Sequence, residues 1–135
     1  GLQSLIPSLL TSAVIGFPFT LPDIIGGNAY WNQTPDTELM IRWAQVSAFM
    51  PAVQWSIPPW EVSSVAYEAS VKVMHMRERL LLPKLAALAE DAKASLEPIC
   101  RPMWWLDPND AQTFAIDDQF AVRAKMSGDV SKNCK

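Results

Sequence analysis

Three strand-like segments alternate with helical ones along this chain, and that order constrains the fold more than any single motif. Residues 14–21 are apolar nearly throughout, as in a parallel strand buried on both faces. Residues 49–56 and 97–102 are the next two strand candidates, and prolines keep both of them short. Strands that alternate with helices are joined by right-handed crossovers, so the order predicts an α/β fold with a parallel sheet.

Helical patterns fill the intervals between these strands. Leucines and an isoleucine recur at helical spacing over residues 2–13. The second helix is predicted to have Thr34 as its N-cap and Pro35 in its first helical position, and to end near Ala48.

A longer helical pattern begins near Ser63 or Ser64. Pro83 is expected to kink or split it, and the pattern resumes over residues 84–94. The apolar face of this helix includes Val62, Val65, Ala66, Ala69, Val73, Met76 and Leu80. The opposite, polar face carries Glu68, Lys72, Arg77 and Glu78.

The length of the chain limits how much of a sheet it can build. A complete (β/α)₈ barrel needs about 250 residues, whereas this chain has 135. Three strands with two crossovers therefore predict a segment of such a barrel. Residues 117–122 are expected to form a fourth strand, and residues 126–135 a frayed tail.

Composition excludes several classes of protein. Half of the residues are hydrophobic and 19% are charged, which is too apolar for a disordered chain and indicates surface that something else covers. The net charge of −3 does not favour nucleic acid or an anionic membrane as a partner. Residues 1–22 carry no charge, but their prolines and hydroxyl side chains favour a helix and a buried strand over a membrane span. Cys100 and Cys134 lack the spacing of metal ligands; two separate thiols are the favoured interpretation, and a disulfide is the alternative.

The end of the first predicted strand is the place where chemistry is expected. The apolar run stops at Asp23, and Gly26, Gly27 and Asn28 follow almost at once. Ligands in α/β folds bind at the carboxyl ends of strands, next to such loops.

Five motifs in a fixed order carry a resemblance to a known family. They are FPFTLPDIIGG at 17–27, PDTELMIRWAQVSAFMP at 35–51, PPWE at 58–61, PICRPMWW at 98–105 and DDQF at 117–120. Together they resemble the later part of the catalytic barrel of family 31 glycoside hydrolases, over roughly residues 1–122. The resemblance implies a partial TIM barrel over residues 1–116, made of its last strands and helices. It implies the start of a β-sandwich region, and then the tail, over residues 117–135.

The activity that the resemblance implies is the retaining hydrolysis of α-glycosides by two aspartates, a nucleophile and a general acid/base. In the family these lie on strands that precede the matching region, so no catalytic residue is assigned to this chain. Neither a metal nor an organic cofactor is implied. The implied partners are an α-linked glycoside and the missing N-terminal half of the barrel, with no nucleic acid and no direct membrane contact.

Four residues are predicted to contact substrate: Asp23, Asn28, Trp55 and Ser56. By the resemblance, Asp23 is the motif aspartate of a strand end, and Ser56 stands where α-glucosidases place a sugar-binding histidine. A local structural role is the alternative for Asp23 and Asn28, and packing is the alternative for Trp55.

Other candidate site residues have simpler interpretations. Trp60 is able to stack on a sugar face, with packing as the alternative. Packing is favoured for Trp104 and Trp105, and a surface or interface position for His75. The sequon that begins at Asn32 fits a lumenal or secreted parent protein.

Three functions remain open. The favoured one is a fragment of a retaining α-glycosidase whose parent is lumenal, membrane-anchored or secreted. The first alternative is a truncated or catalytically dead relative that binds carbohydrate or protein. The second is a self-standing α/β binding domain.

Overall fold

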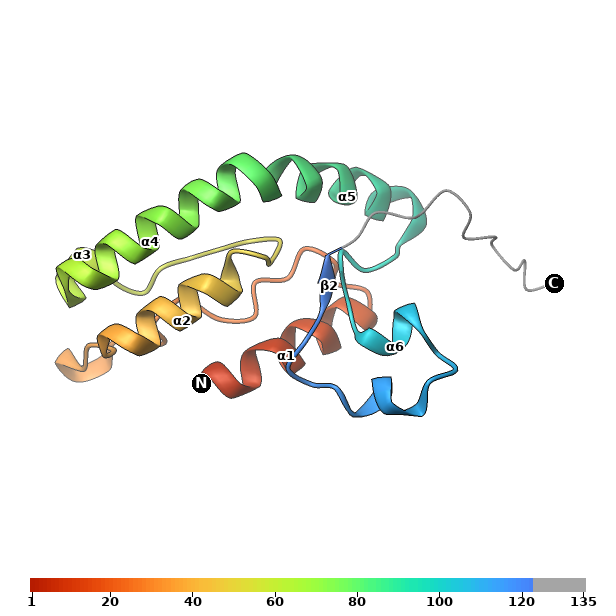
Figure 1. Cartoon of the computed structure of the whole chain (residues 1–135), viewed down its shortest axis with the longest axis horizontal. Helices are drawn as coiled ribbons and strands as arrows, with labels where there is room; N and C mark the ends of the chain where they lie inside the picture. Colours follow the sequence, from red (N-terminus) through yellow and green to blue (C-terminus); the bar gives the residue numbers. More distant parts are fainter. Residues whose placement is uncertain (123–135) are drawn as a thin grey trace.

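A computed structural model describes residues 1–122, and helices dominate it (Figure 1). The α-helices are α1 (Leu2–Val14), α2 (Thr37–Ser47), α3 (Pro59–Val62), α4 (Ser64–Met76), α5 (Leu82–Ser95) and α6 (Met103–Leu106). The other elements in residues 1–122 are two 3₁₀ turns, a π-helical turn and two strands. They are η1 (Tyr30–Asn32), η3 (Ala111–Ala115), η2 (Arg77–Leu81), β1 (Cys100–Arg101) and β2 (Ala121–Val122). The predicted tail at 126–135, and Cys134 within it, lie outside the described residues.

The predicted first helix is confirmed, but the strand expected at residues 14–21 is wrong. Helix α1 continues to Val14, and Gly16 ends it with a φ of +102°. The amide of Phe17 donates to the carbonyl of Ser12 at 2.9 Å, and that of Gly16 donates to Ala13 at 3.3 Å. These two bonds form a Schellman motif, so the first residues of the apolar run belong to a helix end. Prolines at 18 and 22 interrupt the remainder.

The predicted parallel sheet is reduced to one parallel bridge between Ile25 and Trp55. The Ile25 amide donates to the Gln54 carbonyl at 2.7 Å, and the Ser56 amide donates to the Ile25 carbonyl at 3.0 Å. The strand expected at 49–56 is therefore wrong except at this bridge. The described residues form a helix-rich fold with a small open sheet.

The two remaining predicted strands form in shortened versions and pair with each other. Residues 97–102 contribute β1 and residues 117–122 contribute β2. They run antiparallel, with Cys100 opposite Val122 and Arg101 opposite Ala121.

Helix α2 begins two residues later than predicted. Asp36, rather than Thr34, is the N-cap, and its Oδ1 accepts a hydrogen bond from the Leu39 amide at 2.8 Å. A carboxylate at this position also interacts favourably with the positive end of the helix dipole. Pro35 consequently lies outside the helix.

The predicted long helix is confirmed, including its interruption before Pro83. Ser63 caps α4 by accepting a hydrogen bond from the Ala66 amide at 3.1 Å. The π-helical turn η2 joins α4 to α5, and Pro83 lies in the first turn of α5. Pro83 has no N–H to donate, so the α-helical hydrogen-bond pattern cannot continue through it. Figure 1 shows α4 and α5 as one long arch, with α2 beside α4.

The prediction for the two faces of this helix is wrong in part. Val65 and Leu80, assigned to the apolar face, are exposed, whereas Arg77, assigned to the polar face, is buried. The helices pack on a core whose fully buried members include Leu9, Ile25, Met40 and Met50. Within residues 1–122, no helix has both the length and the apolar character needed to cross a bilayer.

Candidate functional site

The bridge between Ile25 and Trp55 brings two of the predicted site segments together. Gly26 follows the bridge with a φ of +91°, which favours glycine. A Cβ atom at Gly26 would lie 2.8 Å from Ser56 Oγ and 3.1 Å from the Met40 side chain. The two segments are thus in close contact at the end of the bridge, and glycine is required there for both conformation and space.

Ser56 is half-buried, and its hydroxyl is already engaged. Its Oγ donates to the Ile25 carbonyl at 2.9 Å, next to the bridge bond from the Ser56 amide. A hydroxyl has one proton and two acceptor lone pairs. Ser56 can therefore offer a ligand an acceptor without breaking the bond to Ile25.

In the sequence, Asp23 precedes this contact and Asn28 follows it. Asp23 is half-buried, and its Oδ1 accepts a hydrogen bond from the neighbouring Ile24 amide at 2.8 Å. This bond is the local structural role named above as the alternative, and the second carboxylate oxygen is another acceptor. Asn28 is exposed.

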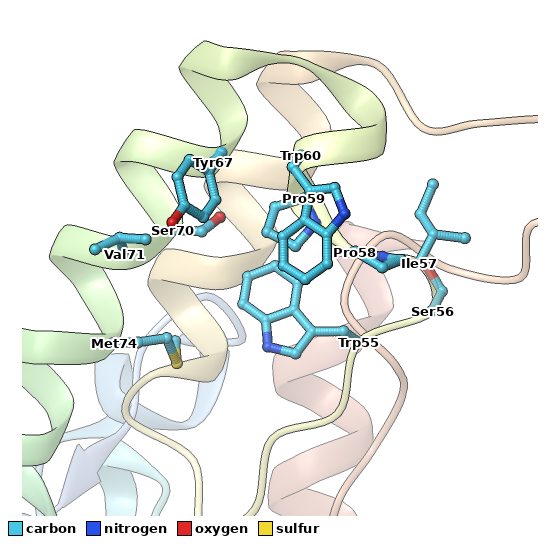
Figure 2. Close-up of a pocket in the computed structure, with 10 residues that line it drawn as sticks. All are labelled: Trp55, Ser56, Ile57, Pro58, Pro59, Trp60, Tyr67, Ser70, Val71 and Met74. Atoms are coloured by element: carbon cyan, nitrogen blue, oxygen red, sulfur yellow. The ribbon is translucent and has the colours of Figure 1, made fainter.

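A pocket of about 360 Å³ lies between the segment after the bridge and helix α4 (Figure 2). We call it the α4 pocket; its lining residues are Trp55, Ser56, Ile57, Pro58, Pro59, Trp60, Tyr67, Ser70, Val71 and Met74. In Figure 2, Tyr67, Val71 and Met74 follow α4 on one side, and Trp55 and Trp60 lie on the other. The rings of Trp60 and Tyr67 meet edge to face, with centroids 6.0 Å apart. Two of the predicted site residues, Trp55 and Ser56, thus share one pocket, whereas Asp23 and Asn28 do not line it.

The α4 side of this pocket was missed in the sequence, although a signal was present. Tyr67, Ser70, Val71 and Met74 recur at helical spacing. Ser70 is 2% exposed, and its Oγ has no hydrogen-bond partner among the described residues. A buried hydroxyl without a partner is costly, and Ser70 is one of the residues that line this pocket.

The chemistry that this pocket can perform is binding. Its lining consists of aromatic, apolar and hydroxyl side chains, without a carboxylate or a cation. Flat apolar faces pack on aromatic rings, but glycoside hydrolysis needs a pair of carboxyl groups. In residues 1–122, His, Cys, Asp and Glu do not form a group of three or more that could hold a metal ion.

Two buried titratable groups, Arg77 and Cys100, lie close together. Burial lowers the pKa of the Arg77 guanidinium, and the nearby Cys100 acts in the opposite direction. Burial raises the pKa of the Cys100 thiol to about 12, and Arg77 only partly offsets this rise. Cys100 is therefore a neutral thiol at pH 7 and a poor nucleophile.

The remaining candidates lie outside the α4 pocket. Trp104 stacks on Phe114, with centroids 5.9 Å apart and planes at 7°, in agreement with the predicted packing role. His75 is exposed, as predicted. Asp107 is exposed, and its carboxylate accepts a hydrogen bond from the Asn109 amide in a turn.

Comparisons with known proteins place this chain in a family. Residues 1–87 match the sequence model described as "Glycosyl hydrolases family 31 TIM-barrel domain". The chain is 43% identical to mouse myogenesis-regulating glycosidase and 34% identical to the SITS-binding protein of Tetronarce californica; each alignment covers 90% of this chain. It spans only 18% of the length of either relative.

A solved structure extends the similarity to the fold. The structure of a family 31 α-glucosidase from Bacteroides thetaiotaomicron superposes with a TM-score of 0.79 at 27% identity, over 90% of this chain and 21% of that one. The relatives thus agree with the sequence motifs and with the arrangement of the elements: the chain belongs to glycoside hydrolase family 31.

Proposed function

We propose that this chain is the later part of the catalytic barrel of a retaining α-glycosidase, and that it supplies one wall of the substrate pocket. The bridge between Ile25 and Trp55 carries this proposal, because it pairs two segments of a family 31 sequence in parallel, as neighbouring strands of a barrel are paired. Residues 1–116 belong to the barrel in this proposal, and residues 117–135 begin the β-sandwich region.

The substrate is a terminal α-linked sugar. Three groups form hydrogen bonds with sugar hydroxyls: the free carboxylate oxygen of Asp23, the amide of Asn28 and the hydroxyl of Ser56. Trp55 packs on an apolar face of the sugar ring. Ser56 stands where α-glucosidases of the family place a histidine, which argues against an α-glucoside. By the resemblance, we propose an α-galactoside. The nucleophile and the general acid/base come from the rest of the barrel.

The exposed apolar surface supports a partner that completes the barrel. Phe17, Phe19 and Trp60 are exposed large side chains, and exposed apolar groups of this size are expected to meet another part of a protein. The N-terminal half of the barrel is the partner in this proposal.

A chimaera tests the proposal. Residues 1–122 replace the matching segment of the mouse relative, and hydrolysis of aryl α-galactosides and aryl α-glucosides is measured. We expect the chimaera to hydrolyse the galactoside and the isolated 135-residue chain to hydrolyse neither. Turnover by the isolated chain, or a folded chimaera without activity, would contradict the proposal.

A binding function without hydrolysis is the second candidate. One relative is named for binding SITS rather than for an enzymatic activity, and the α4 pocket is lined without charged groups. An inactive but folded chimaera that still binds methyl α-galactoside would favour this candidate over the enzyme.

A further inference from the structure

We propose that Arg77 is a positioning residue that fixes the segment from Met50 to Ser56, and through it the wall formed by Trp55 and Ser56. The anchoring stands on the geometry of the chain alone. Its consequence for a sugar rests on the function proposed above.

The Arg77 side chain is enclosed by backbone carbonyls. Arg77 is 6% exposed. Its Nη1 donates to the carbonyls of Ala48 and Met50, the latter at 2.7 Å, and its Nη2 donates to the carbonyl of Pro51 at 3.1 Å. No carboxylate forms an ion pair with it among residues 1–122, so these carbonyls are the acceptors that compensate for burial of the charge.

The acceptors lie where a cation is electrostatically favoured. Ala48 is the C-cap of α2, and the last carbonyls of a helix lack partners within the helix. The negative end of the helix dipole lies there, so a guanidinium at this position satisfies orphan acceptors and interacts favourably with the dipole.

The segment that follows is held at two points. Arg77 binds its first residues through the carbonyls of Met50 and Pro51. The bridge to Ile25 holds its last residues, through the Gln54 carbonyl and the Ser56 amide. Residues 52–54 between these points lie outside the helices and strands, so the position of Trp55 depends on both anchors.

Arg77 lies where α4 meets the π-helical turn, on the helix face that also carries the buried residues Ala66 and Ser70. Arg77 is the first residue of η2, and its neighbours Glu78, Arg79 and Leu80 are exposed. A π turn takes more residues per turn than an α-helix, and such turns often occur at functional sites. Arg79 lies in the same turn on the outside, so it provides a matched control.

Amide hydrogen exchange of the 135-residue chain tests the proposal without a sugar. The amides of Ile25 and Ser56 report on the bridge, and those of Leu9 and Leu88 report on the helices. In Arg77→Met we expect the bridge amides to exchange about tenfold faster or more, relative to the helix amides, because a charged anchor is lost. Arg77→Lys should fall between that variant and the unchanged chain, since an ammonium group cannot reproduce the fork of the guanidinium. Arg79→Met should leave the exchange unchanged.

The outcomes separate positioning from general stabilisation. Equal acceleration of all amides, or an unchanged bridge in folded Arg77→Met, would overturn the proposal. If Arg77→Met does not fold, the Arg77→Lys variant decides on the same criterion. The expected bridge response, together with a folded chimaera that neither binds nor hydrolyses an α-glycoside, would contradict the proposed function and leave the positioning role in place.

Discussion

Two segments of similar apolar character, residues 14–21 and residues 49–56, have different environments in this molecule. Both are predicted to be strands from their composition, and neither forms one. In the first, Ile15 and Phe17 are 66% and 65% exposed, and their backbone amides donate back to helix α1. In the second, Met50 is fully buried, and Arg77 and Ile25 bind the backbone from two other elements. Apolar composition indicates that a segment favours burial, but partners elsewhere in the fold decide whether it is buried.

The largest expected difference between the two segments is in packing. Met50→Ala should lower the free energy of unfolding by about 3 kcal/mol, because it leaves a cavity in the core. Phe17→Ala should change it by about 0.5 kcal/mol or less, because the ring is exposed. Urea denaturation of the two variants measures both values. Similar losses would show that the segments are equally buried.

The next effect depends on pH and concerns Cys100, which is buried beside the second segment. Its Sγ lies 3.9 Å from the carbonyl oxygen of Phe49. The folded-state pKa of Cys100 is about 12, above the value of about 8.5 expected for the unfolded chain. The folded chain thus holds this proton more tightly. The resulting stabilisation is complete below about pH 8.5 and is lost as the pH rises toward the folded-state pKa, by up to about 1.4 kcal/mol per pH unit.

Urea denaturation at pH 8 and pH 10 measures this dependence. Cys100→Ala should remove about 1 to 2 kcal/mol of the decrease between these two pH values. The same pH dependence in both proteins would mean that water reaches the thiol, and that the second segment is not closed over it.

The smallest expected effect distinguishes two glycines with similar φ angles. Gly16, in the first segment, has a φ of +102°, and a Cβ added there would meet no atom within 4 Å, so Gly16→Ala should cost about 1 kcal/mol in backbone strain alone. Gly26, which faces the second segment, has the added clash with Ser56 Oγ, so Gly26→Ala should cost about 1 kcal/mol more. Thermal unfolding compares the two, and equal losses would argue against a tight contact at the bridge.

The helices of this fold were predictable because their signals are local. The start of α4 at Ser63 follows from its N-cap, and the interruption before α5 follows from Pro83. The strands were less predictable, because a strand needs a partner for its backbone groups. Ile25 and Trp55 pair at one position only, so apolar runs alone overestimated the sheet.

Part of the α4 pocket could be predicted from the sequence. The rest depends on contacts between segments that are far apart in the sequence. Ser56 was predicted from the family resemblance and Trp55 from its aromatic side chain, and both line the α4 pocket. The charge of Arg77 favoured a polar face, although Arg77 stands seven residues after Ser70 and eleven after Ala66, which are both buried and share its face of the helix. Ser70 shares the helical spacing of Tyr67, Val71 and Met74, but a serine does not by itself indicate burial.

The most direct test of the central claim, that this chain forms one wall of a sugar pocket, is the activity of the chimaera with Asp23→Asn. Asparagine keeps the size of the side chain and an oxygen that can accept from the Ile24 amide, so the fold should be preserved. We predict that kcat/KM for an aryl α-galactoside falls by about tenfold to a hundredfold, because a charged hydrogen bond to the sugar is lost. Unchanged kcat/KM in the folded Asp23→Asn chimaera would contradict the claim.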